Sequence, residues 1–204
     1  MPEREPSRPY QALLAKGEQR RSRILVVAQR LLTRYGWRNT TLAQIAEKAG
    51  VTRAGLLHHF ESKDQLLRAV LDARDDDDER HADLGGDVIA GIENVVERFR
   101  RSPDLIGMYT VLLAENLDPD APLRGRLLDR HRGALDFIAE GIRRGQRAGR
   151  FRTDIDPAVK AVEVAAFLSG METIWLLDPS VSLDEVFHSY ARALEHELAR
   201  VDMR

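Results

Sequence analysis

Apolar residues recur three and four positions apart along most of the chain, the spacing that places them on one face of an α-helix. Between residues 18 and 35 this stripe consists of Ile24, Val27, Ala28, Leu31, Leu32 and Tyr35. No segment shows the sustained alternation of apolar and polar residues that indicates a β-strand. The pattern therefore predicts an all-α protein of about nine helices.

Proline, glycine and capping residues divide this pattern into separate helices. Gly36 and Gly50 are expected to end the first two helices, and the pair Gly85-Gly86 to end the fourth. Thr41-Leu-Ala-Gln44 fits a capping box at the start of the second helix. The predicted helices cover approximately residues 18–35, 41–49, 52–59, 62–81, 87–101, 104–117, 122–148, 157–177 and 182–202.

Composition excludes several kinds of site. The 204 residues include no cysteine, which excludes disulfides, thiolate zinc sites and thiol catalysis. No apolar run is long enough to cross a membrane, and the N-terminal MPEREPSRPY lacks the apolar segment of a signal peptide, so a cytoplasmic protein is expected. There is no glycine-rich phosphate loop and no specific set of nucleophile, acid and base, so neither an enzyme nor a cofactor is expected.

Charge is distributed unevenly along the chain. Residues 1–70 carry 13 Lys and Arg against 6 Asp and Glu, whereas residues 71–204 carry 18 against 27. A basic segment followed by an acidic one is typical of a nucleic-acid-binding domain joined to a domain with another role. Chance clustering of surface charge is the alternative.

Two short helices around Ala49-Gly50-Val51 predict a helix-turn-helix motif. Glycine allows the left-handed turn, while Val51 and Leu56 hold the second helix across the first, which leaves the other face of that helix free for the major groove of DNA. Arg53 is the leading base contact, because arginine binds the O6 and N7 atoms of guanine. The candidate DNA-binding residues are Thr40, Thr41, Thr52, Arg53, Ala54, Gly55, Leu57, His58, His59 and Lys63.

Two clusters of possible metal ligands have simpler explanations. His58 and His59 are neighbours on a helix and point about 100° apart, so a shared metal ion is geometrically awkward and DNA contact or solvent exposure is favoured. The run Asp75 to Glu79 fans out around its helix in the same way and is typical of a solvated segment near a helix end. No metal site is therefore expected.

The N-terminal motif resembles that of the TetR family of bacterial transcriptional regulators. The resemblance extends over about 45 residues at fixed spacing. It rests on Gly36, Thr40, Thr41, Ile45-Ala46, Ala49-Gly50-Val51-Thr52, Leu56, His58, Phe60, Lys63 and Leu66. Leu57 departs from the pattern, because the family usually has a tyrosine there that contacts the DNA backbone. His59, Lys63 and the basic segment Lys16, Arg20, Arg21 and Arg23 are expected to supply backbone contacts instead.

The resemblance also implies what the rest of the chain does. It implies a flexible arm over residues 1–17, a DNA-binding domain over 18–62, and a ligand-binding and dimerisation domain over 63–204. The residues expected to line a ligand pocket are Met108, Tyr109, Leu112, His131, Phe137, Phe167, Met171 and Trp175. The last two helices are expected to form the homodimer interface through Ala166, Gly170, Phe187, Tyr190, Leu194 and Leu198.

The sequence thus predicts a homodimeric, ligand-responsive repressor that binds a palindromic DNA operator and is released by a small, largely apolar effector. Two other classes of protein stay open. A nucleoid-type protein would share the basic domain but bind DNA without sequence preference. A helical enzyme or ligand carrier would show no affinity for DNA at low salt.

Overall fold

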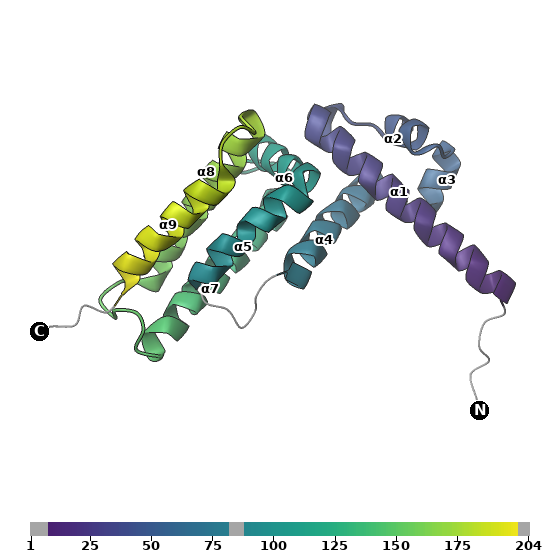
Figure 1. Cartoon of the computed structure of the whole chain (residues 1–204). Coiled ribbons are helices and arrows are strands. Elements are labelled where there is room, and N and C mark those ends of the chain that lie inside the picture. Colours follow the sequence, from purple (N-terminus) through teal and green to yellow (C-terminus); the bar gives the residue numbers. More distant parts are fainter. Residues whose placement is uncertain (1–7, 82–87, 200–204) are drawn as a thin grey trace, which may run out of the picture. The chain divides into compact units, whose positions relative to one another are not determined.

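The computed structural model describes residues 8–81 and 88–199, and every regular element in this part of the chain is an α-helix (Figure 1). Internal contacts divide the chain into two compact units, residues 1–79 and 80–204. The all-α fold predicted from the apolar spacing is confirmed. The predicted break at Gly85-Gly86 lies outside the described residues.

The N-terminal unit contains α1 (Arg8–Asn39), α2 (Leu42–Ala49), α3 (Arg53–His59) and α4 (Lys63–His81). Helix α1 begins at Arg8 and not near residue 18, so residues 8–17 are helical where a flexible arm was expected. Pro9 is compatible with this start, because the first turn of a helix does not use its backbone N–H groups. At Gly36 the backbone leaves helical geometry with φ of 72°, the left-handed conformation that favours glycine.

Apolar side chains of α1, α2 and α4 form most of the core of the unit, to which α3 adds Leu56. The side chains that are almost completely buried include Ile24, Ala28 and Leu32 of α1, Ile45 and Ala46 of α2, and Leu66, Leu67, Val70 and Leu71 of α4. Contacts assign α4 as far as Glu79 to this unit, whereas the sequence-based division placed the boundary after residue 62.

The C-terminal unit contains α5 (Val88–Arg101), α6 (Pro103–Glu115), α7 (Arg124–Arg147), α8 (Pro157–Leu177) and α9 (Leu183–Leu198). Helix α7 packs along α8, and α5 packs along α9. Aromatic rings form the centre of the core, where the Phe99 ring meets Trp175 and Phe187 edge to face at 5.5 Å. Such pairs add to the stabilisation from burial because the positive edge of one ring meets the negative face of the other.

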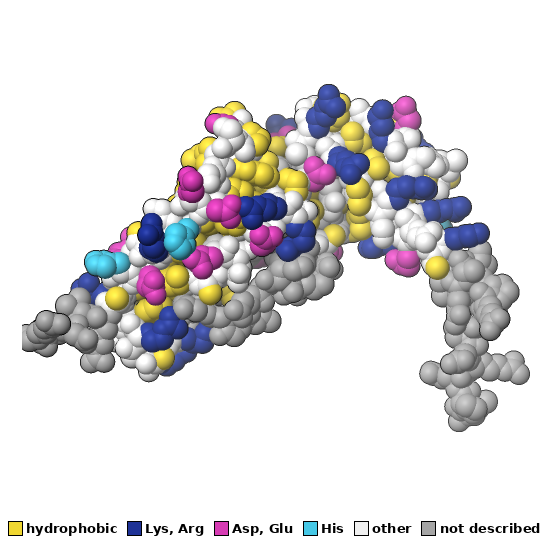
Figure 2. Space-filling view, in the orientation of Figure 1, with side chains coloured by type: hydrophobic (Ala, Val, Ile, Leu, Met, Phe, Trp, Pro, Cys, Tyr) yellow, Lys and Arg dark blue, Asp and Glu magenta, His cyan; other side chains and the backbone are white. Residues whose placement is uncertain are grey.

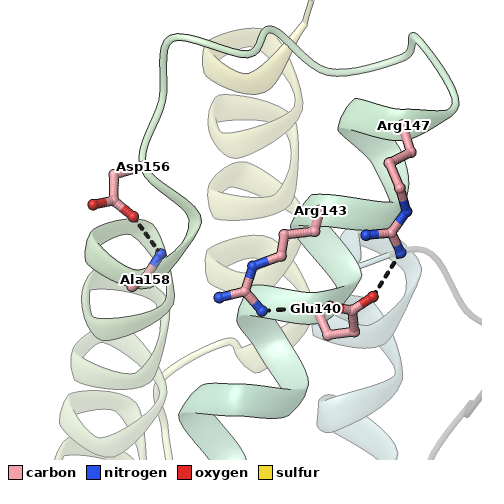
Figure 3. A network of polar contacts seen from close by, with 5 residues as sticks. All are labelled: Glu140, Arg143, Arg147, Asp156 and Ala158. Atoms are coloured by element: carbon pink, nitrogen blue, oxygen red, sulfur yellow. Dashed lines mark hydrogen bonds and ion pairs between the residues drawn. The ribbon is translucent and has the colours of Figure 1, made fainter.

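Local contacts stabilise the end of α7 and the start of α8, and a backbone hydrogen bond holds the segment between them. Glu140 accepts hydrogen bonds from Arg143 at 3.4 Å and Arg147 at 2.6 Å, and Asp156 caps α8 by accepting from the Ala158 N–H at 2.8 Å (Figure 3). The Arg152 N–H donates to the Leu198 carbonyl at 2.9 Å, which joins this connection to the end of α9.

Helix α6 is buried on most of its circumference, as expected for an apolar helix surrounded by others. Its buried residues are Ile106, Gly107, Met108, Tyr109 and Leu112. Within residues 8–81 and 88–199, no helix combines the length and apolar character needed to cross a membrane.

Candidate nucleic-acid interface

Helices α2 and α3 are joined by a turn whose local interactions account for the motif. Thr41 and Gln44 form the predicted capping box, in which the Thr41 N–H donates to Gln44 Oε1 at 2.8 Å and the Gln44 N–H donates to Thr41 Oγ1 at 3.3 Å. Gly50 ends α2 in the left-handed conformation, with φ of 64°. Thr52 caps α3, because its Oγ1 accepts from the Gly55 N–H at 3.0 Å.

One face of α3 is anchored in the unit. Leu56 is completely buried, and Phe60, directly after the helix, is 1% exposed. The Val51 N–H donates to the Ala46 carbonyl at 3.0 Å, which holds the turn against α2. Because a short helix would not be stable alone, this packing is what sets the orientation of α3.

The opposite face of α3 is exposed, as the sequence predicted. Thr52, Arg53, Ala54, Leu57 and His58 are exposed, and Gly55 and His59 are partly exposed. A helix with a buried anchor on one side and arginine, histidines and small residues on the other has the shape and chemistry to enter a major groove.

The predicted role of Gly55 changes with the structure. A Cβ atom on Gly55 would lie 3.1 Å from Thr52 Oγ1, closer than most Cβ contacts. The sequence predicts Gly55 to be one of the DNA-binding residues. The structure shows that it also makes room for the helix cap.

Thr40 lies inside the protein and not on the predicted DNA-facing surface. Its side chain is 1% exposed, and its hydroxyl donates to the Gly36 carbonyl at 2.7 Å. This hydrogen bond satisfies a carbonyl that the kink at Gly36 removes from the helix ladder. Thr41 remains exposed, although its hydroxyl takes part in the capping box.

Lys63 is held at the end of α1. Its ammonium group donates to the Trp37 carbonyl at 2.5 Å and lies 4.0 Å from the centroid of the Trp37 indole. A cation is stabilised both by the carbonyls at a helix C-terminus and by the face of an aromatic ring. Lys63 therefore ties α4 to α1, a role that the spacing of the motif did not reveal.

His58 and His59 lie edge to face, with ring centroids 5.5 Å apart. Burial lowers the pKa of His59 below 6.5, and the nearby charges of His58, Arg20 and Arg21 lower it further. Within the described residues no group of three or more His, Asp or Glu side chains is arranged to hold a metal ion. Residues 76–79 of the acidic run lie outside the described side chains.

Sequence-based interpretation underestimated one neighbour of α3, the N-terminal half of α1. The Arg21 guanidinium lies 5.3 Å from the centroid of the Phe60 ring, and Arg20 is close enough to influence His59. The basic residues were visible in the sequence, but helical spacing did not show that Arg20 and Arg21 lie beside His59 and Phe60.

The residues predicted to line a ligand pocket lie in different parts of the C-terminal unit. Met108, Tyr109, Leu112 and Met171 are buried, and Phe167 and Trp175 are partly buried against the aromatic core. Phe137 is 45% exposed on α7. His131, also predicted to line the pocket, is exposed, because the turn of α7 from residue 131 to 134 does not contribute to the core.

The residues predicted to form a dimer interface divide between core and surface. Phe187, Leu194 and Leu198 are 3% exposed or less, so they complete the core of one subunit and offer no surface to a second. Tyr190 is partly buried and stacks on Phe167 at 3.6 Å. Ala166 and Gly170 are exposed on α8.

The exposed surface of α8 is largely apolar. Val159 and Val162 are 57% and 53% exposed, and Leu177 at the end of the helix is 86% exposed. Figure 2 shows hydrophobic side chains at the end of the unit where α8 leads into α9. Spacings of three, four and seven residues place Val159, Val162, Ala166, Gly170 and Leu177 on one side of α8, which we call the α8 face.

Comparison with known proteins agrees with this structure. Residues 24–70 match the family model described as "Bacterial regulatory proteins, tetR family". The HTH-type transcriptional regulator TtgR of Pseudomonas putida is 29% identical over 179 residues, covering 80% of this chain and 83% of that protein. The HTH-type transcriptional repressor AcnR of Corynebacterium diphtheriae is 27% identical over 155 residues, covering 74% of this chain and 78% of that protein.

A solved structure shows the same fold over most of the chain. The transcriptional regulator FadR from Bacillus subtilis, in complex with stearoyl-CoA, superimposes with a TM-score of 0.72 at 17% identity, covering 87% of this chain and 98% of that chain. The matched segment contains the capped α2 and α3 helices described above. Over residues 24–70 the chain carries the DNA-binding domain of the TetR family of bacterial regulatory proteins, and it is a helix-turn-helix transcriptional regulator.

Proposed function

We propose that the protein is a homodimeric repressor that binds a pseudo-palindromic DNA operator and is released by a small molecule. The exposed face of α3, with Arg53 in its first turn, is the observation that carries this proposal. Two such helices in one dimer would enter successive major grooves about 34 to 36 Å apart. A regulator of this kind would act in the cytoplasm, where the bacterial chromosome lies.

Individual side chains of the interface have different roles in this proposal. Arg53 contacts a guanine, and Ala54 and Leu57 offer apolar contact to a thymine methyl group. His58 points from the same face, while His59 and the exposed N-terminal end of α2 face the phosphate backbone. Lys63 positions α4 against Trp37 and contributes positive charge near the backbone.

The α8 face is the proposed contact between two subunits. Small and apolar exposed residues allow two helices to approach closely, and their burial in a dimer supplies hydrophobic stabilisation. The interface therefore differs from the one predicted from the sequence, because Phe187, Leu194 and Leu198 support α9 from within its own subunit.

Ala166→Glu is expected to convert the dimer into monomers. A carboxylate at the centre of the α8 face would have to lose its hydration in the interface without gaining a partner. Sedimentation at micromolar concentration measures the oligomeric state. Operator affinity is expected to fall by about 100- to 10,000-fold, because the two recognition helices are no longer linked.

The matched control is Ala134→Glu, which places the same charge on an exposed alanine of α7. This variant is expected to remain dimeric and to bind the operator as the unaltered protein does. A dimeric Ala166→Glu protein would contradict the proposed interface.

The C-terminal unit is the proposed effector-binding domain. Its core is rich in aromatic and aliphatic side chains, so a largely apolar effector is expected. The structure of FadR, which has the same fold, contains stearoyl-CoA, a ligand with a long apolar chain. An effector that favours the non-binding state by about 1 to 3 kcal/mol would reduce operator affinity about 5- to 150-fold.

Selection of bound sites from random DNA tests the central proposal. The expected result is an enriched site with two related halves, bound more tightly than scrambled DNA of equal length. Compounds are then screened for release of that site. Equal affinity for all sequences would instead support a nucleoid-type protein, and no affinity at low salt would support a ligand carrier.

Operator affinity is expected to rise as pH falls towards the pKa of His59 in the free protein, which lies below 6.5. The pKa of His59 is lowered in the free protein, so the ring is neutral at pH 7 and above. A DNA phosphate would raise the pKa of His59 in the complex, so DNA binding takes up a proton. Operator affinity therefore increases as pH falls from the pKa of His59 in the complex to its pKa in the free protein. At lower pH the ring is protonated in both states, and the affinity increases no further.

Dissociation constants between pH 5 and 8 measure this effect. His59→Gln is expected to flatten the profile, since glutamine donates a hydrogen bond but does not titrate in this range. His58→Gln is the control for the neighbouring ring. A His59→Gln protein with the unaltered pH profile would exclude His59 as the source.

A further inference from the structure

We propose that the N-terminal half of α1 is a second DNA-binding surface, which contacts phosphates of the duplex beside the half-site that α3 binds. This inference rests on the proposed function, because it adds contacts to the same complex. The surface consists of Lys16, Arg20, Arg21 and Arg23, and we call it the α1 ridge.

The α1 ridge lies next to the C-terminal end of α3. Arg21 stacks its guanidinium over Phe60, the residue that follows α3, at 5.3 Å from the ring centroid. Arg20 lies close enough to His59 for its charge to act on that ring. The positive side chains of α1 therefore lie beside the last turn of α3, which carries His58 and His59.

Helical spacing aligns the ridge. Lys16, Arg20 and Arg23 are separated by four and three residues, so they lie on the same side of α1, and all three are exposed. Arg21 lies about 100° further round, towards Phe60. The single carboxylate between residues 8 and 39 is Glu18, which the same spacing places on another side of the helix.

The chemistry of the ridge matches a phosphate backbone. Between residues 15 and 23 the exposed uncharged neighbours of the ridge are small or polar, namely Ala15, Gln19 and Ser22, and the exposed apolar Val26 lies beyond this segment. A helix that binds a membrane surface would need an apolar face beside its charges, which residues 15–23 do not present. Duplex DNA offers closely spaced phosphates, and α3 is proposed to place DNA directly beside the ridge.

The length of α1 sets the reach of this contact. The helix continues from Arg20 back to Arg8, a distance of about 18 Å at 1.5 Å per residue. Figure 1 shows the N-terminal end of α1 extending past α3. At about 3.4 Å per base pair, the helix can follow up to about five base pairs outside the half-site.

The test compares Arg20→Gln/Arg23→Gln with Arg132→Gln/Arg192→Gln. Both double variants lose two exposed positive charges, one pair from the ridge and the other from α7 and α9. The probes are the selected operator with flanks of about 3 or about 12 base pairs on each side, and a scrambled duplex of the longer length. Affinity is measured across a salt series, with helical content checked by circular dichroism.

The unaltered protein is expected to bind the long-flank operator more tightly than the short one. The ridge variant is expected to lose this difference. The slope of its logarithmic affinity against logarithmic salt concentration is expected to become shallower by about 0.9 for each lost phosphate contact. The α7 and α9 variant is expected to keep both properties. Arg20→Lys/Arg23→Lys is expected to keep the slope, since phosphate accepts either cation.

Unchanged flank preference and salt slope in the ridge variant would overturn the inference. So would a lysine variant that loses the slope as fully as the glutamine variant, because that loss would come from a structural change. Failure of the proposed function is a separate result. In that case the unaltered protein prefers no sequence, and the scrambled duplex still reports whether the ridge contributes to the salt slope.

Discussion

Replacing Arg53 with alanine is expected to remove most of the discrimination between the operator and scrambled DNA. Arg53 is exposed in the first turn of α3, the part of a recognition helix nearest the base edges. A bidentate contact to guanine contributes about 1 to 3 kcal/mol, so discrimination should fall about 5- to 150-fold for each half-site. Competition binding against scrambled duplex measures this ratio.

Two further variants separate base contact from charge. Arg53→Lys keeps the positive charge but loses the planar fork, so its affinity for scrambled DNA should stay near that of the unaltered protein while discrimination falls. Arg68→Ala removes an exposed arginine of α4 and should leave discrimination intact. If Arg53→Ala weakens operator and scrambled DNA equally, Arg53 contacts phosphate and the proposed base contact is wrong.

Gly145→Ala is expected to lower the free energy of unfolding of the C-terminal unit by about 2 to 4 kcal/mol. A Cβ atom at this position would lie 2.0 Å from Cδ2 of Phe151, which is 4% exposed. The Phe151 ring would have to leave its buried site. This movement would strain the segment after α7, which is bonded to the end of α9. No left-handed backbone is involved, so the cost is steric.

Gly133→Ala provides the control on the same helix. Nothing lies within 4 Å of a Cβ atom there, so the variant should gain about 0.5 to 1 kcal/mol from the better helix propensity of alanine. Urea unfolding in a shared Trp37→Phe background leaves Trp175 as the fluorescent reporter of the C-terminal unit. Equal stability of the two alanine variants would contradict the steric argument.

Local interactions explain why the helix-turn-helix was predictable from sequence. The capping box needs only Thr41 and Gln44, three residues apart, and the left-handed turn needs only Gly50. Both features are determined within a few residues of chain, so no distant contact is required to recognise them. The exposed face of α3 follows from the position of its anchor, Leu56.

Contacts at the kinked end of α1 explain what was missed within the same unit. Thr40 was expected to face DNA, but its hydroxyl donates to a carbonyl exposed by the kink at Gly36. Lys63 was expected to be a simple phosphate ligand, but its ammonium lies on Trp37, 26 residues earlier in the chain. In both cases the partner atom is brought near by the kinked end of α1, which spacing does not show.

The sequence by itself determined that the chain is helical, where most helices begin and end, and which short helix presents Arg53. These properties depend on propensity, capping and periodicity, which act over a few residues. Only the tertiary structure decided what covers each apolar stripe. Phe187 and Leu194 on α9 are covered by their own subunit, while Val159 and Val162 on α8 remain exposed. Periodicity shows that a face is apolar, but the partner of that face depends on how the whole chain packs.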